Sequence, residues 1–156
     1  MKPIYFDYNA ATPLDADVLK AMQPFLGGIY GNPSSVHGIG REARALLDDA
    51  RDRIAKQLRC KPSELVFTSG GTESNNLAIL GAARKLRSTG RHIVTSPTEH
   101  HAVLHTIDYL VANEGFEKTL LPIDGSGQID PEDVRKALRK DTILVSVMSA
   151  NNEIGV

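Results

Sequence analysis

Cysteine is nearly absent from this sequence, which has one among its 156 residues. Cys60 therefore has no partner for an internal disulfide, and a single thiol cannot provide the cysteine-rich ligand set of a structural zinc site. Long apolar runs are missing too, because none approaches the roughly 18 residues that a membrane-spanning helix needs. An acidic residue at Asp7 also comes too early for the core of a signal peptide. We therefore expect a cytoplasmic protein with no membrane segment, no disulfide and no bound metal.

An excess of charge of one sign is absent as well. Eighteen Lys and Arg residues stand against nineteen Asp and Glu residues, which gives a formal net charge of -1. The basic residues are spread over several segments, whereas nucleic-acid-binding domains cluster them on one face. We expect no nucleic-acid partner. The 41% apolar content of a chain of this length instead predicts a globular fold with one core.

Short β-rich runs alternate with stretches of helical period from Ser63 onward. Two of the runs, 64–68 and 142–148, are nearly continuous apolar stretches, as expected where helices cover both faces of a parallel sheet. Asp130 is the predicted N-cap of the last helix, with Pro131 at its first position. The βαβαβαβ order predicts an α/β fold with a mostly parallel sheet. The predicted strands are residues 64–68, 92–96, 118–123 and 142–148, and the predicted helices are residues 73–87, 101–114 and 131–139.

Two helices are predicted upstream of this pattern, at residues 15–25 and 40–58, with an ordered loop at 27–35 between them. Residues 151–156 follow the last predicted strand directly, although a parallel strand this apolar is normally covered by a helix. We therefore expect the sequence to be part of a larger domain. The longer upstream helix has apolar residues separated by threes and fours, so one stripe should face a core: Ala43, Leu46, Leu47, Ala50, Ile54 and Leu58.

The run Ser69-Gly70-Gly71-Thr72-Glu73-Ser74 lies between a predicted strand and a predicted helix. Glycine lets a backbone approach an anion closely, and the free N–H groups at a helix start can donate to a phosphate. The spacing matches neither a Walker loop nor a dinucleotide-binding fingerprint, which makes nucleotide binding the weaker option. A tight strand-to-helix connection with Thr72 as the helix cap is an equally good interpretation of this run alone.

Polar residues follow two other predicted strands. Thr98-Glu99-His100-His101 comes after the strand 92–96, and Asn151 with Asn152 comes after the strand 142–148. Parallel sheets place their ligands at the carboxyl ends of the strands, where a histidine can stack on a ring or move a proton. Taken one at a time, a solvated loop histidine and turn-forming asparagines are the simpler interpretation. Together with the glycine run, the three segments should converge on one edge of the sheet.

These residues carry a resemblance to cysteine desulfurases, which belong to the class V aminotransferase group of enzymes that use pyridoxal 5'-phosphate (PLP). The similarity runs in order across essentially the whole chain. Ala11 departs from the threonine common in the family. The five motifs that carry the resemblance are Tyr5-Phe6-Asp7-Tyr8-Asn9-Ala10-Ala11-Thr12-Pro13-Leu14, Gly31-Asn32-Pro33-Ser34-Ser35, Phe67-Thr68-Ser69-Gly70-Gly71-Thr72-Glu73-Ser74-Asn75-Asn76, Thr98-Glu99-His100 and Asn151-Asn152-Glu153-Ile154-Gly155-Val156.

The resemblance implies roles for four residues. Gly71 and Thr72 would hold the cofactor phosphate, His100 would stack on the pyridine ring as the catalytic residue, and Asn151 would bond to the phenolic oxygen. It also implies the PLP-dependent aminotransferase-type fold. Residues 1–14 would lie near the small domain and the active-site entrance, and 15–156 would form the N-terminal portion of the large PLP-binding domain.

Other family residues have no counterpart in the sequence. The family's cofactor-binding lysine directly follows a histidine, and each of the eight lysines here follows another residue. In the family's order, the aspartate at the pyridine nitrogen, a nearby glutamine and the sulfur-accepting cysteine lie beyond Val156. We expect Cys60 to have a packing or solvent role, because no neighbouring feature would lower the pKa of a thiol there.

The function that the resemblance implies is removal of sulfur from L-cysteine, which gives alanine and an enzyme persulfide for iron–sulfur cluster or thiocofactor assembly. A homodimer and a sulfur-acceptor or scaffold protein are the implied partners, and this segment alone is expected to be inactive. Three alternatives remain: a related PLP enzyme of the selenocysteine lyase type, a non-catalytic truncated chain that binds a partner subunit, and a phosphate-binding α/β module without PLP.

Overall fold

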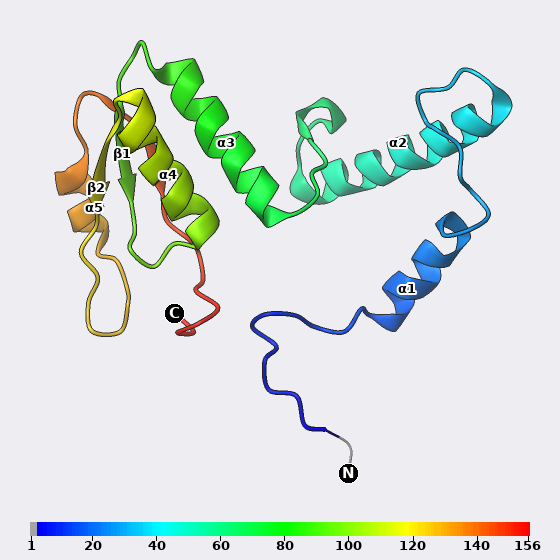
Figure 1. Ribbon diagram of the computed structural model, residues 1–156, viewed down its shortest axis with the longest axis horizontal. Helices are drawn as coiled ribbons and strands as arrows, with labels where there is room; N and C mark the ends of the chain where they lie inside the picture. The colour runs from blue at the N-terminus through cyan, green and yellow to red at the C-terminus, as the bar shows by residue number, and fades with distance from the viewer. Residues whose placement is uncertain (1–2) are drawn as a thin grey trace. The chain divides into compact units, whose positions relative to one another are not determined.

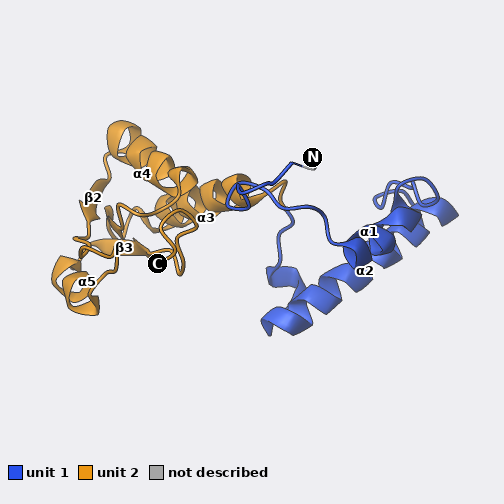
Figure 2. Cartoon of the chain, turned by 90° about the horizontal axis from the view of Figure 1, so that it is seen from below, with its two compact units in different colours: residues 1–67 blue, residues 68–156 orange. Residues whose placement is uncertain are grey.

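The computed structural model describes residues 3–156. The chain divides into two compact units, Met1–Phe67 and Thr68–Val156 (Figure 2). We describe each unit by itself. In the residues described, none of the helices has both the length and the apolar character that crossing a bilayer requires.

The first unit is built from helices whose ends are set by local hydrogen bonds. Helix α1 (Ala16–Met22) begins at Asp15, whose carboxylate accepts from the Asp17 N–H at 2.8 Å, and the 3-10 turn η1 (Gln23–Phe25) follows it. Helix α2 (Gly38–Leu58) begins at His37, whose Nδ1 accepts from the Gly40 N–H at 3.2 Å. Both predicted upstream helices are therefore present, the longer one two residues longer than expected.

The apolar stripe of α2 is only partly covered, contrary to the prediction that it faces a core. In the part of the unit that the structure describes, Ala55 is the one apolar side chain classed as buried. Ile54 is 41% exposed and Leu58 is 64% exposed. The periodicity predicted the helix correctly. An apolar stripe shows only which face of a helix can be buried, and not whether another element packs against it.

The strand predicted at residues 64–68 is not formed, so the first element of the expected βαβαβαβ order is wrong. The 3-10 turn η2 (Pro62–Glu64) takes its place, followed by an irregular stretch. The Leu65 carbonyl accepts from Arg51 Nη1 of α2 at 2.6 Å, and the Arg51 guanidinium lies 4.6 Å from the Phe67 ring centroid. Contacts with the preceding helix replace the ladder of a neighbouring strand.

The second unit contains a three-stranded parallel sheet in the order β2-β1-β3 (Figure 1). The predicted helices and the other three predicted strands are confirmed, with the strands one or two residues shorter than expected. Asp130 caps α5 by accepting from the Glu132 N–H at 2.8 Å, as predicted. The elements are α3 (Gly71–Leu86), β1 (His92–Thr95), α4 (His101–Glu114), β2 (Glu117–Leu120), α5 (Pro131–Ala137) and β3 (Thr142–Ser146).

The core of this unit lies where α3 and α4 pack together against the sheet. All four residues of the central strand β1 are buried, and Ile93 is the one that belongs to the core beneath the helix pair. Gly115 ends α4 with a φ of 67°, which glycine adopts without a steric penalty, and so turns the chain into β2. The buried cluster consists of Ile79, Ala83, Ile93, Val103, Ile107, Leu110 and Phe116.

A buried histidine links the three strands. His92 in β1 is fully buried, with Nδ1 2.7 Å from the hydroxyl of Thr142 in β3 and Nε2 2.8 Å from the hydroxyl of Thr119 in β2. Burial, with the charge of Arg139 as a second cause, lowers the pKa of His92 below its usual value. The neutral ring is therefore favoured, and its two nitrogens tie the sheet together across its width.

Candidate functional site

The carboxyl ends of β1 and β3 bring two of the predicted segments together. The Asn151 amide donates through Nδ2 to the Thr98 carbonyl at 2.8 Å, 53 residues away in sequence. The Ser146 hydroxyl donates to the largely buried Glu99 carboxylate at 2.7 Å. Residues after the two strands thus meet at one edge of the sheet, as their positions after parallel strands predicted.

The third segment forms the start of α3. Gly70 is the N-cap and Gly71 the first helical residue, so the interpretation of Thr72 as the cap is wrong. Among the described residues no side chain caps this end, which leaves the first N–H groups of the helix directed outward. A Cβ added at Gly71 would meet no atom within 4 Å, so the space beside the first turn is open.

The Glu73 carboxylate belongs to the same turn. It accepts from the Ser69 hydroxyl at 2.7 Å and from the Ser69 backbone N–H at 2.6 Å. These two hydrogen bonds hold the pKa of Glu73 below its usual value. The carboxylate thus carries a negative charge and stabilises the loop ahead of the helix, leaving the N–H groups of Gly71 and Thr72 without a side-chain acceptor.

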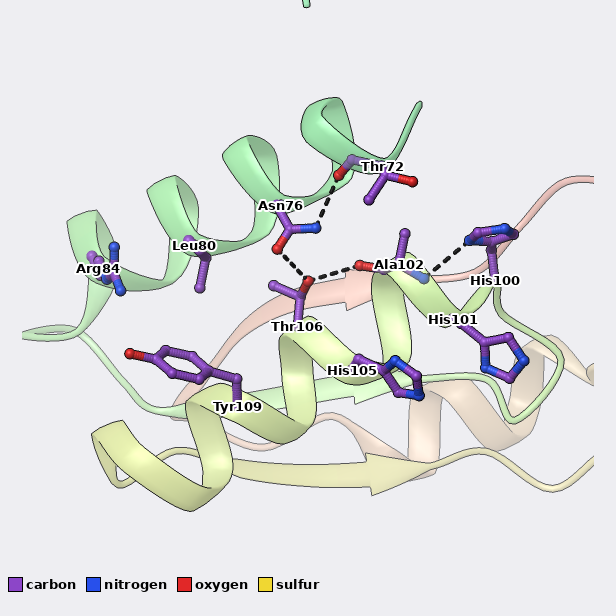
Figure 3. A pocket seen from close by; sticks show the side chains of 10 residues that line it. All are labelled: Thr72, Asn76, Leu80, Arg84, His100, His101, Ala102, His105, Thr106 and Tyr109. Carbon is purple, nitrogen blue, oxygen red and sulfur yellow. Dashed lines mark hydrogen bonds between the residues drawn. The ribbon is translucent and has the colours of Figure 1, made fainter. Parts of the chain in front are cut away.

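A hollow of about 590 Å³ lies between α3 and α4 and contains two of the predicted site residues, Thr72 and His100 (Figure 3). Gly71 is the neighbour of Thr72, and Asn151 lines a separate hollow beside Thr98. The structure therefore places Thr72 and His100 in one pocket and connects Asn151 to it through the loop that leads to His100. The pocket is lined by Thr72, Asn76, Leu80, Arg84, His100, His101, Ala102, His105, Thr106 and Tyr109.

His100 is the N-cap of α4, and its Nδ1 accepts from the Ala102 N–H at 3.0 Å. With Nδ1 acting as acceptor, the proton of a neutral ring sits on Nε2. The cap fixes the edge of the ring while the side chain stays exposed at the pocket. A ring held by one edge with a free face and a free donor can stack on a planar ligand and exchange a proton with it.

Sequence reasoning missed Asn76 and Thr106, which join the two helices behind the pocket (Figure 3). Asn76 Nδ2 donates to the Thr72 carbonyl at 2.9 Å. The Thr106 hydroxyl lies 2.9 Å from Asn76 Oδ1 and 2.7 Å from the Ala102 carbonyl, and is buried. The pair links the second turns of α3 and α4, and each side chain also contacts a carbonyl in the first turn of its own helix. Two features of the sequence could have identified these residues. One is the four-residue spacing from Thr72 to Asn76, and the other is the polar Thr106 on the otherwise apolar face of α4.

Asn151 also forms the turn that the simpler interpretation expected. Its Oδ1 accepts from the Glu153 N–H at 2.8 Å and from the Ile154 N–H at 3.0 Å. The side chain therefore both shapes the chain after β3 and connects it to Thr98. The second amide hydrogen is directed at the Met148 sulfur, 3.4 Å from Nδ2, a weak acceptor that a ligand at the sheet edge can replace.

Cys60 belongs to the first unit and is not among the residues that line this pocket. It follows the left-handed residue Arg59 that ends α2, and its backbone N–H donates to the Ala55 carbonyl at 3.0 Å. The thiol is partly buried. Its position is that of a helix C-terminus, in agreement with the packing or solvent role expected from the sequence.

Comparison with known proteins agrees with the motifs. The family described as aminotransferase class-V matches residues 4–156. The chain belongs to this family. It is also similar to the protein named cysteine desulfurase IscS of Dictyoglomus turgidum (strain DSM 6724 / Z-1310), with 55% identity over 154 residues, 99% of this chain and 39% of that protein.

Solved structures share the fold of this chain. One described as a NifS-like protein superposes with a TM-score of 0.91 at 44% identity and covers 96% of this chain. Another, described as SspA in complex with cysteine, gives a TM-score of 0.87 at 42% identity over 96% of this chain. The chain spans about two fifths of the length of these proteins, 41% and 43% respectively. The predicted resemblance and the predicted α/β fold of the aminotransferase type are confirmed.

Proposed function

We propose that this chain is the N-terminal part of a PLP-dependent cysteine desulfurase, which removes sulfur from L-cysteine to give alanine and an enzyme persulfide for iron–sulfur cluster or thiocofactor assembly. The observation that carries the proposal is the 55% identity to a protein named cysteine desulfurase over 99% of the chain. The neighbour solved in complex with cysteine supports the substrate. The pocket shared by Thr72 and His100 supports a site in this segment.

The residues at the pocket suit the phosphate and ring of PLP. The N–H groups of Gly71 and Thr72 would hold the phosphate at the open, uncapped start of α3. The exposed ring of His100 would lie against the pyridine, and the Asn151 amide would reach the phenolic oxygen. Bound PLP supplies an electron sink for the amino-acid substrate. The ionised Glu73 in the same turn opposes a second negative charge, so we expect phosphate affinity in this segment to be low.

The whole enzyme would need more than this segment. A homodimer, a sulfur-acceptor or scaffold protein, and a cytoplasmic location remain the expected setting. Residues 1–14 would lie near the small domain and the active-site entrance, and residues 15–156 would belong to the large domain. Because no lysine here follows a histidine, we expect this segment alone to bind PLP weakly and reversibly and to have no desulfurase activity.

Equilibrium dialysis of the 156-residue chain against PLP tests the cofactor assignment. Thr72→Val removes a hydroxyl at the phosphate, and His100→Ala removes the ring. Each should weaken binding by roughly tenfold, the effect of losing one hydrogen bond to a charged group or one stacking partner. Thr89→Val and His37→Ala are matched controls outside the pocket and should bind as the original chain does. Equal binding by all five proteins would contradict the assignment.

Borohydride reduction followed by peptide mapping tests whether the segment is complete. We expect scattered, substoichiometric labelling of exposed lysines such as Lys85 and Lys140. One lysine labelled stoichiometrically at low PLP, together with turnover of L-cysteine, would show a complete enzyme and overturn the proposal that this is a part of one.

Desulfurase assays on a longer chain that carries the lysine and the acceptor cysteine test the roles of two residues. His100→Ala should strongly reduce activity, because the ring faces the cofactor. Cys60→Ala should leave activity unchanged, because its thiol lies at the end of α2 and not at the pocket. A large loss from Cys60→Ala in a protein that still folds would mean that the sulfur acceptor has been misplaced.

A further inference from the structure

Three of the five histidines gather at the start of α4, where they line the pocket between α3 and α4 (Figure 3). His101 and His105 are stacked, with ring centroids 5.2 Å apart and ring planes 26° apart. The His100 ring centroid is 6.3 Å from that of His101. His101 and His105 are both exposed. The cofactor assignment uses His100 and gives the other two no role.

The spacing of the stacked pair suits a metal ion. Side chains four residues apart on a helix project from the same face, one turn above the other. Two histidines at this spacing form the helical half of known zinc sites. Within residues 3–156 neither ring has a hydrogen-bond partner that would compete with a metal, and exposed rings are free to rotate until one nitrogen of each meets the ion.

We propose that His101 and His105 form a binding site for a first-row divalent transition-metal ion. Imidazole is a favoured ligand of Ni²⁺, Cu²⁺ and Zn²⁺, whereas Mg²⁺ and Ca²⁺ prefer oxygen. In the described residues no group of three or more His, Cys, Asp or Glu side chains is arranged to hold a metal. Two protein ligands therefore hold the ion, and water completes its coordination.

The neighbouring charges do not compete for the ion. Arg84, at the far end of the pocket, is paired with Glu114 at 2.7 Å, and Asp108 is paired with Lys118. His100 is already held as a helix cap through Nδ1. The inference depends only on the pair on α4 and not on the proposed desulfurase function. An ion there would lie at the rim of the pocket, beside His100.

Calorimetric titration of the 156-residue chain with Ni²⁺ tests the site. We expect one equivalent to bind, and His101→Gln or His105→Gln to weaken binding at least tenfold. His100→Gln, His37→Gln and Cys60→Ser should bind as the original chain does. Wild-type affinity in both pair variants, or loss of binding in the His37 or Cys60 variant, would overturn the proposal.

A spectroscopic readout keeps the test valid if a substitution disturbs α4. Paramagnetic Ni²⁺ added to the unmodified chain should broaden the ring proton signals of His101 and His105 at lower metal concentration than those of His37. Broadening of His37 first, or of all exposed histidines together, would show nonspecific binding and refute a site at the pair. PLP binding by the His101→Gln variant should be unchanged, so failure of the metal site and failure of the cofactor assignment are distinguishable.

Discussion

The second unit of this chain is about a third longer than the first, but the numbers of apolar side chains that the two units bury differ far more than that. Of the eleven apolar side chains classed as buried in the described residues, only Ala55 belongs to the first unit. That unit is held by helix caps and by exposed ion pairs such as Arg44 with Asp48. An exposed pair at this four-residue spacing stabilises a helix by only about 0.3–0.5 kcal/mol. The second unit has a core to which two helices and a strand contribute.

The difference shows which parts of a structure local sequence determines. Helix formation in the first unit follows from caps and periodicity within twenty or so residues. Burial requires residues far apart in the chain, and in the second unit the sheet brings them together. Large apolar side chains in the first unit stay exposed, among them Phe6 at 89% and Val36 at 87%. We expect the second unit to carry most of the cooperative stability.

Truncating one isoleucine in each unit should give the largest contrast. Ile107→Ala removes a fully buried side chain from the core and should lower the free energy of unfolding by about 2–5 kcal/mol. Ile54→Ala, at a position 41% exposed on α2, should cost less than about 1 kcal/mol. Urea denaturation followed by circular dichroism compares them. Equal losses would mean that the first unit has a core of its own.

Replacing two glycines of the second unit by alanine, one at a time, should give the next largest difference in stability. A Cβ at Gly90 would lie 2.1 Å from the Asp141 carbonyl oxygen, so Gly90→Ala forces the backbone before β1 away from the backbone before β3. We expect a loss of about 1–3 kcal/mol, as for other overpacked sites. Gly81→Ala in α3 meets open space and should be neutral or stabilise by up to about 1 kcal/mol. The same urea experiment measures both, and a harmless Gly90→Ala would show that the two strand entries are not closely packed.

The sequence predicted the second unit better than the first for a physical reason. Asp130 and Pro131 are local signals, and the helix that they begin starts at the predicted residue. The apolar run at 64–68 carried the same strand signal as β3, but a strand exists only with a neighbour. Residues 64–68 contact α2 instead, through Arg51. No local pattern in the sequence could have shown that these residues contact α2 and do not pair with a strand.

The candidate site likewise has features that the sequence predicted and features that it did not. The chain order of strands and motifs was enough to predict that the loop before His100 and the turn at Asn151 meet at one sheet edge. The link from Asn76 to Thr106 spans 30 residues and depends on how two helices pack, which periodicity does not specify. The stacked pair of histidines on α4 was visible as a four-residue spacing, but its exposure and its place at the pocket required the structure.

The buried histidine of the sheet should make the stability of the second unit depend on pH. The pKa of His92 is lowered in the folded chain, so between that value and the unfolded value of 6.5 the unfolded chain binds the extra proton. The free energy of unfolding should therefore fall as the pH drops below 6.5, by at most about 1.4 kcal/mol per pH unit. His92→Gln should remove this component, whereas His37→Gln in the first unit should keep it. Urea midpoints at pH 7.5, 6.5 and 5.5 measure it, and an unchanged pH response in His92→Gln would assign it to another group.

Removing either of two matched helix caps should give the smallest difference in stability. Helices α1 and α5 are both seven residues long, and each begins at an aspartate that accepts a backbone N–H at 2.8 Å. Replacing a cap by alanine typically costs about 0.5–2 kcal/mol of helix stability.

Helix α5 connects β2 to β3 of one sheet, so Asp130→Ala should lower global stability by about 1 kcal/mol. Neither helix has a fully buried residue, but every residue of α1 is exposed, whereas Val134 and Ala137 of α5 are half-buried. Helix α1 can therefore fray without disturbing a core, so Asp15→Ala should leave the global transition unchanged and only speed amide exchange within α1. Urea titration together with hydrogen exchange distinguishes the two losses. A global loss from Asp15→Ala as large as that from Asp130→Ala would show that the first unit folds as one cooperative body with the second, which the distribution of buried side chains argues against.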